Sequence, residues 1–204
     1  MQVRMNIGSV VLDGILELPH GTKSTVIFAH GSGSGRFSPR NNYVARVLRD
    51  AGFGTLLFDL LTGEEDQIYQ NRFDIDLLAE RLAATTDWLL DRTEEATIGY
   101  FGASTGAAAA LQASVKYPAV RALVSRGGRP DLAWDYLGSV RAPTLLIVGG
   151  LDHEVLTLNE RALGRLATRK DLAVVPGATH LFEEPGTLEE ASKLAAAWFT
   201  EFLK

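Results

Sequence analysis

The 204-residue sequence contains no cysteine. The chain can therefore form no disulfide, no thiolate metal site and no cysteine nucleophile. Proteins of the reducing cytosol do without disulfides, so this absence fits a cytoplasmic location. The N-terminal residues 1–6 contain no basic segment that leads into a long apolar run. We therefore expect no signal peptide.

An excess of positive charge and a long apolar run are also missing. The formal net charge is −5, whereas nucleic-acid binding needs a concentrated basic face, so we expect no nucleic-acid partner. No stretch approaches the roughly 20 apolar residues of a membrane helix, so we expect no membrane partner and a cytoplasmic protein. We find no repeat or linker, and the sequence predicts a single domain over residues 1–204.

Short apolar runs alternate with helical patterns along the whole chain. This rhythm predicts an α/β fold, with a mostly parallel sheet covered by helices on both faces. The predicted strands are Val3–Ile7, Val10–Leu18, Ser24–Ala29, Gly54–Phe58, Thr97–Phe101, Ala122–Ser125, Thr144–Val148 and Asp171–Val175. The predicted helices are Asn42–Ala51, Phe73–Leu90, Thr105–Lys116, Leu156–Ala167 and Leu188–Leu203.

The most informative motif is Gly102-Ala103-Ser104-Thr105-Gly106, between a predicted strand and a predicted helix. A GxSxG sequence in that setting is typical of a nucleophile elbow, which exposes the serine hydroxyl at the edge of the sheet. Glycine is needed because the turn is strained and crowded. The same motif can arise by chance, so a base and an acid are needed to support catalysis by Ser104.

Asp152 and His180 follow the last two predicted strands, at the same edge of the sheet as Ser104. A serine needs an imidazole base, and the imidazole needs a carboxylate that orients it. The chain order serine, acid, histidine is that of α/β hydrolases. The sequence predicts Ser104, Asp152 and His180 as a catalytic triad. Asp131 is the alternative acid, and His153 is interpreted as a residue at the rim of the site.

A glycine-rich loop, His30-Gly31-Ser32-Gly33-Ser34-Gly35, follows the third predicted strand. It lacks the third glycine of a dinucleotide fingerprint and the Gly-Lys-Ser/Thr ending of a P-loop. We interpret it as the loop that donates one oxyanion N–H, from Ser32 or, as second choice, Gly33. The other donor is the N–H of Thr105. We expect His30 to order the loop rather than act as a base.

Four arginines, namely Arg36, Arg40, Arg126 and Arg129, fall in loops near the same edge. Loop arginines are often simply solvated. Alternatively, these four bind the substrate, because a guanidinium grips a carboxylate or phosphate at two points. The second reading predicts an anionic substrate.

Four segments of the sequence, HGSGSG, GASTG, GGLD and GATHLFEEPG, together resemble the dienelactone hydrolase-like family of the α/β-hydrolase superfamily. The resemblance covers essentially the whole chain. It implies an eight-stranded sheet, no metal or organic cofactor, and hydrolysis through an acyl-serine. Dienelactone hydrolases proper use a cysteine nucleophile, so Ser104 favours a carboxylesterase or lactonase instead. Some relatives are fused to a phosphoribosyltransferase-like domain, which we do not expect in this chain.

The predicted strands and helices leave little room for a lid, and Leu61–Arg72 is the only sizeable candidate insertion. We therefore expect an open site for a small ester or lactone, in a monomer or homodimer. Two alternatives remain. The fold could serve as a binding or receptor protein with little turnover, or the same triad could carry out acyl transfer or amide hydrolysis.

Overall fold

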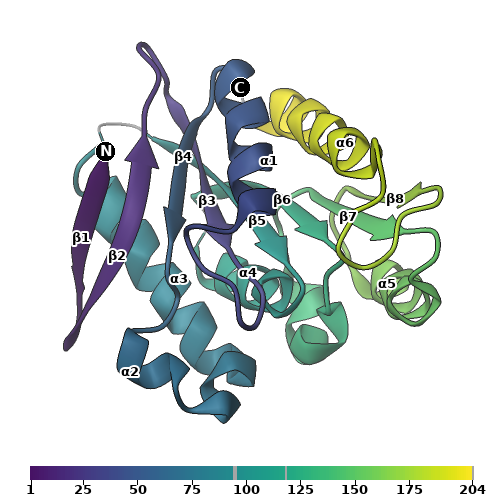
Figure 1. Ribbon diagram of the computed structural model, residues 1–204, viewed down its shortest axis with the longest axis horizontal. Coiled ribbons are helices and arrows are strands. Elements are labelled where there is room, and N and C mark those ends of the chain that lie inside the picture. The colour runs from purple at the N-terminus through teal and green to yellow at the C-terminus, as the bar shows by residue number, and fades with distance from the viewer. Residues whose placement is uncertain (94–95, 118, 204) are drawn as a thin grey trace.

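The computed structural model describes residues 1–93, 96–117 and 119–203. Its centre is an eight-stranded sheet with the strand order β1-β2-β4-β3-β5-β6-β7-β8 (Figure 1). The strands are β1 (Gln2–Ile7), β2 (Val10–Glu17), β3 (Ser24–Ala29), β4 (Gly54–Phe58), β5 (Thr97–Ala103), β6 (Val120–Arg126), β7 (Thr144–Gly149) and β8 (Lys170–Val175). The β1–β2 and β2–β4 pairs are antiparallel, and the other pairs of this sheet are parallel. The predicted fold class is confirmed.

The burial of the strands follows from their sequences. Every residue of β3 and of β7 is buried, and both are continuous apolar runs of the kind that lies between two helical layers. The first hairpin instead alternates, and the facing pair Met5 and Leu12 is buried on its inner side. Gly8, with a φ of 58°, makes the turn between β1 and β2.

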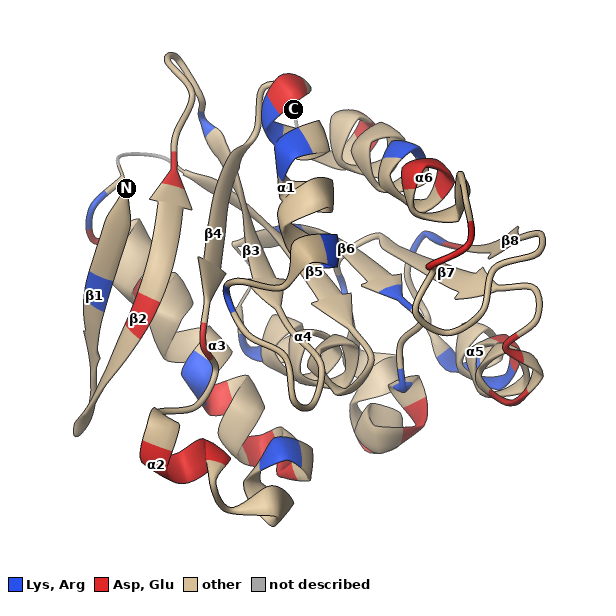
Figure 2. Ribbon diagram, viewed as in Figure 1, with Lys and Arg blue, Asp and Glu red and all other residues tan. Residues whose placement is uncertain are grey.

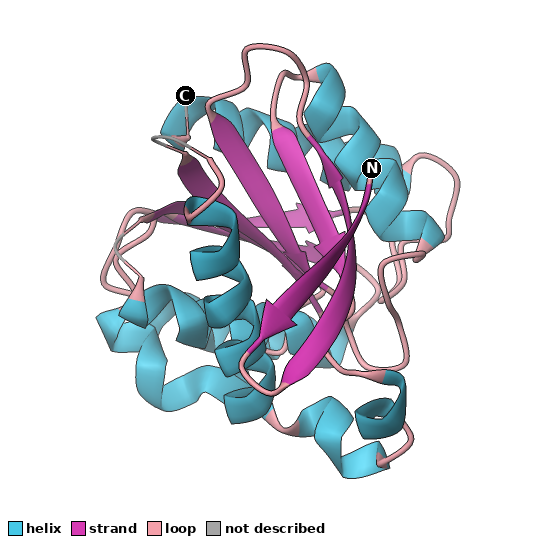
Figure 3. Cartoon of the chain, turned by 90° about the vertical axis from the view of Figure 1, so that its left-hand side faces the viewer, coloured by secondary structure: helices cyan, strands magenta, loops and turns pink. Residues whose placement is uncertain are grey.

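Helices cover both faces of the twisted sheet, as the turned view in Figure 3 shows. The helices α1 (Pro39–Asp50) and α6 (Thr187–Phe202) pack together over one face. The other face carries α3 (Ile75–Leu90), α4 (Thr105–Lys116), α5 (His153–Arg165) and the 3-10 helix η2 (Pro130–Ser139). Each face has its own hydrophobic core, so the sheet is buried from both sides.

Capping side chains explain where two helices begin. Ser38 accepts a hydrogen bond from the N–H of Asn41 at 3.3 Å and Pro39 follows it, so α1 begins three residues before the predicted Asn42. Asp74 accepts from the N–H of Leu77 at 3.0 Å and starts α3 two residues later than predicted. The sequence analysis did not predict η2.

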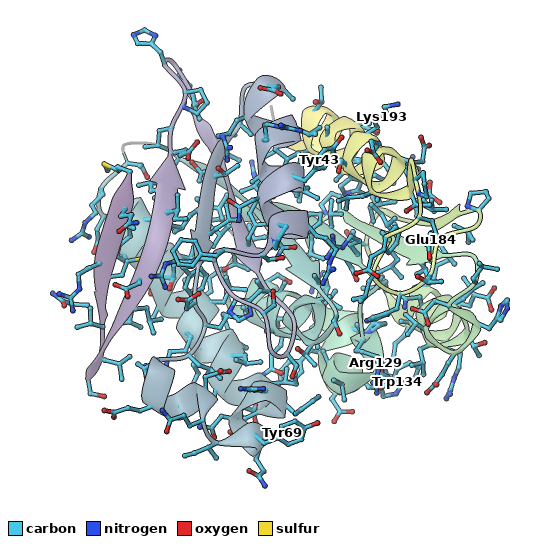
Figure 4. All side chains as sticks on the ribbon, viewed as in Figure 1. Tyr43, Tyr69, Arg129, Trp134, Glu184 and Lys193 are labelled. Atoms are coloured by element: carbon cyan, nitrogen blue, oxygen red, sulfur yellow. The ribbon has the colours of Figure 1, made fainter. Side chains whose placement is uncertain are left out.

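The candidate insertion Leu61–Arg72 contains the short helix α2 (Gly63–Asp66) and the start of η1 (Tyr69–Phe73). A capping box between Thr62 and Glu65 begins α2, which carries a run of acidic residues (Figure 2). Tyr69 lies exposed at the outer end of this segment (Figure 4). No helix within the described ranges is long and apolar enough to cross a membrane.

The strand order reverses between β3 and β5. From β3 the chain passes through α1 to β4 on one side, and from β5 it passes through α4 to β6 on the other. The loops after β3 and β5 therefore diverge to opposite faces and leave a crevice at the carboxyl ends of the strands. The predicted site residues lie around this crevice.

Candidate active site

Ser104 lies in a strained turn between β5 and α4. Its φ of 51° and ψ of −122° lie outside the usual regions for an L-residue. A Cβ atom at Gly102 would collide with the backbone of Ala107, and one at Gly106 would collide with the carbonyl of Ala29. Glycine at both positions lets the strand and the helix approach closely enough to form the predicted elbow.

Backbone hydrogen bonds on both sides hold this strained residue. The N–H of Ser104 donates to the carbonyl of Arg126 at 3.3 Å, and the carbonyl of Ser104 accepts from the N–H of Arg129 at 3.1 Å. Strained backbone persists only where its surroundings determine it strongly. The loop after β6 therefore helps to maintain the conformation of Ser104.

His180 and Asp152 form a close pair, with 2.6 Å between Nδ1 of the imidazole and Oδ2 of the carboxylate. Asp152 is the N-cap residue of α5, a position where an Asp side chain usually binds the first helical amides. Here no such capping bond forms, and the carboxylate faces the imidazole instead. The carboxylate is 14% exposed and the imidazole 37%, so the acid is shielded while the base reaches the surface.

The loops that carry these two residues are tied together. The N–H of Leu151 donates to the carbonyl of Ala178 at 2.9 Å. Glu184 accepts from both the N–H and the hydroxyl of Thr179, at 3.0 and 2.6 Å. The first bond joins the acid loop to the histidine loop, and the two bonds of Glu184 brace the histidine loop internally.

A pocket of about 210 Å³ opens at the elbow. Its lining consists of Gly31, Ser32, Ser34, Ser38, Arg40, Asn41, Ala103, Ser104, Arg126, His180 and Leu181. The structure therefore brings Ser104 and His180 to one small cavity, with Asp152 behind the imidazole. No residue of the candidate insertion Leu61–Arg72 is among the described residues that line it.

The glycine-rich loop passes directly over the elbow. A Cβ at Gly31 would lie 2.9 Å from Cβ of Ser104, so only glycine fits there. The N–H of Ser32, our first choice as an oxyanion donor, donates to Oγ1 of Thr105 at 3.0 Å. The N–H of Thr105 itself is at the first position of α4, where a helix offers no internal acceptor.

His30 holds this loop against the segment that follows β4. Its Nδ1 lies 3.0 Å from the carbonyl of Gly31, and its Nε2 accepts from the N–H of Leu60 at 3.0 Å. A carbonyl only accepts, so the ring is the neutral tautomer with its hydrogen on Nδ1. Burial lowers the pKa of His30, which favours the same neutral form. These contacts agree with an ordering role for His30.

Two of the four predicted substrate arginines do not line the pocket. Arg36 forms a close ion pair with Asp59. Arg129, labelled beside η2 in Figure 4, makes a bidentate pair with Asp131 at 2.8 Å. A carboxylate already neutralises each of them, and neither is among the described residues that line the pocket.

The other two, Arg40 and Arg126, line the pocket. Arg126 is 7% exposed, and within the described part of the chain no carboxylate lies at ion-pair distance from it. Within the described structure its guanidinium makes one long polar contact, 3.4 Å from Nη2 to Oδ1 of Asn41, and its buried Nη1 has no partner there. Burial and the nearby charge of Arg40 lower the pKa of Arg126 to about 10.

The sequence analysis missed Asn41 and two aromatic rings. Phe101 and Phe182 lie with their ring centroids 5.9 and 5.8 Å from the guanidinium of Arg126, at cation–π distance. Asn41 is buried at the start of α1, next to Arg40.

The remaining candidates lie outside the pocket. Asp131, the alternative acid, is engaged with Arg129. His153 is exposed at the start of α5. Among the residues that the structure describes, no group of three or more His, Asp and Glu side chains could hold a metal ion.

A mostly parallel eight-stranded sheet, with a serine elbow after β5 and an Asp–His pair after β7 and β8, defines the fold of the α/β hydrolases. The model of the dienelactone hydrolase family matches residues 12–204. The chain belongs to the dienelactone hydrolase family, which confirms the resemblance seen in the sequence.

Similar proteins support this placement. A crystal structure of dienelactone hydrolase from Anabaena variabilis ATCC 29413 shares 54% identity, with a TM-score of 0.96 over 100% of this chain and 98% of that one. XC6422 from Xanthomonas campestris, described as an α/β serine hydrolase without lid, has a TM-score of 0.82 over 98% of this chain and 94% of its own. Its 22% identity supports the fold alone.

A Mycobacterium tuberculosis protein (strain H37Rv) that is provisionally named a phosphoribosyl transferase is 58% identical over 99% of this chain. The match covers 46% of that protein, so this chain spans about half the length of its curated relative. Family membership supports a hydrolase, and the transferase name belongs to the longer protein.

Proposed function

We propose that this chain is a serine hydrolase of small esters or lactones, and that residues 1–204 act as one hydrolase domain. The observation that carries the proposal is the 2.6 Å contact between His180 Nδ1 and Asp152 Oδ2, beside a pocket that Ser104 and His180 both line. This is the arrangement in which an imidazole can activate a serine hydroxyl.

In the acylation step, Ser104 Oγ forms a bond with the ester carbonyl carbon while its proton passes to Nε2 of His180. The carbonyl π electrons move to the oxygen, which becomes an oxyanion. When the tetrahedral intermediate collapses, the bond to the alkoxy oxygen breaks and the alcohol takes the proton from His180. Asp152 keeps the proton of the imidazole on Nδ1 and stabilises the imidazolium.

Water completes the reaction in the same way. His180 takes a proton from water as the water oxygen bonds to the acyl carbon, and the second tetrahedral intermediate releases the carboxylic acid. The proton then returns to Ser104 Oγ. A lactone follows the same course, except that its alcohol and acid remain in one product.

The proposed oxyanion donors are the N–H groups of Thr105 and Ser32. The start of α4 supports Thr105, since a helix N-terminus offers free N–H groups and a partial positive charge. Ser32 has to exchange its bond with Thr105 Oγ1 for the substrate oxygen. Gly33, the next residue of the loop, is the second choice.

We propose further that the substrate carries an anionic group, which Arg126 binds with help from Arg40. A buried guanidinium without a carboxylate is costly, and such groups are normally paired. The unpartnered Nη1 of Arg126 therefore supports an incoming anion as the missing partner. The volume of about 210 Å³ favours a small acyl group.

The test uses a short p-nitrophenyl ester together with a fluorophosphonate probe, and Ser104→Ala as the control. We expect the wild-type protein to release p-nitrophenol and to be labelled at Ser104, and the variant to do neither. Absence of turnover and labelling in the wild-type protein would favour the binding or receptor alternative. Thioester and amide substrates, run in parallel, distinguish an acyl transferase or amidase from an esterase.

A further inference from the structure

The loop between β6 and η2 touches both reactive side chains of the proposed triad. At the end of the loop, the N–H of Arg129 donates to the carbonyl of Ser104, and the N–H of Ser104 donates to Arg126, the β6 residue from which the loop starts. On the other side, Gly127 of the loop lies close to His180. A Cβ atom at Gly127 would lie 3.2 Å from the carbonyl of His180 and 3.5 Å from its Nδ1. A shift of this loop would therefore displace the nucleophile and the base together.

The position of the loop is tightly determined. Gly127 has a φ of 52° and donates its N–H to the carbonyl of Ile147 at 2.8 Å. A Cβ at Gly128 would collide with Oγ of Ser125 and would lie 2.7 Å from Cβ of Ala107. Gly128 can therefore pack against α4 only because it has no side chain.

Asn159 of α5 binds this loop from the far side. Its Nδ2 donates to the carbonyl of Gly128 at 2.9 Å and to the carbonyl of Val155 at 2.8 Å. Asn159 lies in α5, and Asp152 is the N-cap residue of the same helix. Asn159 therefore connects the helix that begins at Asp152 with the loop that touches Ser104 and His180.

The burial of Asn159 indicates that its amide serves to position the Gly127-Gly128 loop rather than to stabilise the fold. The residue is fully buried, and in the described structure its Oδ1 has no hydrogen-bond partner. A buried polar atom without a partner destabilises a protein, whereas a leucine of similar size would avoid that cost. The benefit that remains is the directional bond from Nδ2 to Gly128.

We propose that Asn159 is a positioning residue of the hydrolase. Through the carbonyl of Gly128, its amide holds the relative placement of the Ser104 elbow, the His180 ring and the helix that carries Asp152. This inference rests on the proposed function. The part of the pocket built by α1, with Arg40 and Asn41, does not depend on this bond, so loss of Asn159 should affect the chemical step more than substrate binding.

The experiment compares Asn159→Leu with Gln112→Leu. Gln112 is a buried amide on α4 that donates to Asp76 at 2.5 Å on the side away from the pocket, so both variants remove one buried amide donor. We expect Asn159→Leu to lower kcat for a p-nitrophenyl ester by about 10- to 100-fold, the scale of a small misplacement of reacting groups, with KM nearly unchanged. The rate of fluorophosphonate labelling at Ser104 should fall in parallel.

Gln112→Leu should leave kcat unchanged, whatever its effect on Tm. If Asn159→Leu does not fold, Asn159→Ser replaces it, because a serine hydroxyl can bond to Val155 but is too short to reach Gly128. A kcat within twofold of wild type in the folded Asn159 variant, or an equal loss in Gln112→Leu, would overturn the positioning role. An inactive and unlabelled wild-type protein would instead contradict the proposed function itself.

Discussion

The backbone N–H of Ser32 donates to Oγ1 of Thr105 at 3.0 Å, so a proposed oxyanion donor is occupied by the protein's own hydroxyl. Thr105 is 3% exposed, so little water reaches this contact. During acylation the substrate oxygen has to take the place of Oγ1 on the Ser32 amide. Breaking the bond between the Ser32 N–H and Thr105 Oγ1 raises the activation free energy of acylation, and this increase depends on the threonine hydroxyl.

We expect Thr105→Val to raise kcat/KM for short esters by about fivefold. Valine removes the competing acceptor, and a net hydrogen bond of about 1 kcal/mol corresponds to a factor of that size. The control is Thr144→Val, which removes a buried hydroxyl bonded to Ala142 at 2.9 Å and should leave kcat/KM unchanged. A tenfold fall in Thr105→Val would mean that the hydroxyl itself stabilises the transition state.

The second prediction concerns the choice between the two acids. Asp152→Asn should lower kcat by about 10⁴-fold, because the imidazole then adopts the wrong tautomer and loses its counter-charge. Asp131→Asn, which breaks the pair with Arg129, should leave kcat within a few fold of wild type. Steady-state kinetics on one ester measures both variants. The reverse ranking would transfer the acid role to Asp131.

The third prediction concerns Arg126. Arg126→Met should lower kcat/KM for the anionic p-nitrophenyl hemisuccinate by about 100-fold relative to neutral p-nitrophenyl butyrate, since a charge-assisted contact contributes about 1.5 to 3 kcal/mol. The same variant should raise Tm, because it removes a buried charge that has no carboxylate partner.

Arg129→Met is the matched control for this experiment, because its guanidinium is already bound to Asp131. We expect it to change the activity on both esters equally and to lower Tm slightly. Equal losses on the two esters in Arg126→Met would contradict an anionic substrate, and they would leave the proposed triad unaffected.

The fourth prediction is a pH dependence of stability that His30 causes. Burial lowers the pKa of His30 in the folded protein below its ordinary value near 6.5. Below pH of about 6.5 the unfolded chain therefore binds a proton at His30 that the folded chain does not. The free energy of unfolding should fall as the pH decreases from about 6.5 toward the lowered pKa.

Urea unfolding of wild type and His30→Asn at pH 7.5 and 5.5 measures this effect. At pH 7.5 the wild type should be more stable by about 1 to 3 kcal/mol, because the variant loses the bonds to Gly31 and Leu60. The difference should shrink at pH 5.5. His20→Asn, at an exposed position, controls for general histidine effects. A constant difference at the two pH values would exclude His30 as the cause.

Hydrophobic patterning predicted the strands well. A strand that is buried on both faces, such as β3, is a short and mostly apolar run whichever strands it pairs with, so its sequence alone reveals it. Helix starts were less accurate. Ser38 and Asp74 set the starts of α1 and α3 by capping bonds, which override the apolar periodicity. The 3-10 helix η2 was missed, and its backbone is interrupted at Ala133, whose φ of −118° and ψ of 26° are not helical.

The sequence by itself determined the order of the elements and the candidate triad. Ser104, Asp152 and His180 each follow a strand, and parallel strands end at a common edge, so local patterns were enough to bring them near one another. The arginines required the tertiary structure. Whether a guanidinium is neutralised depends on carboxylates from other parts of the chain, such as Asp59 for Arg36, and on burial between distant rings. Those contacts join residues far apart in sequence, and only the folded chain shows that Arg36 is paired with Asp59 while no carboxylate of the described residues reaches the buried Arg126.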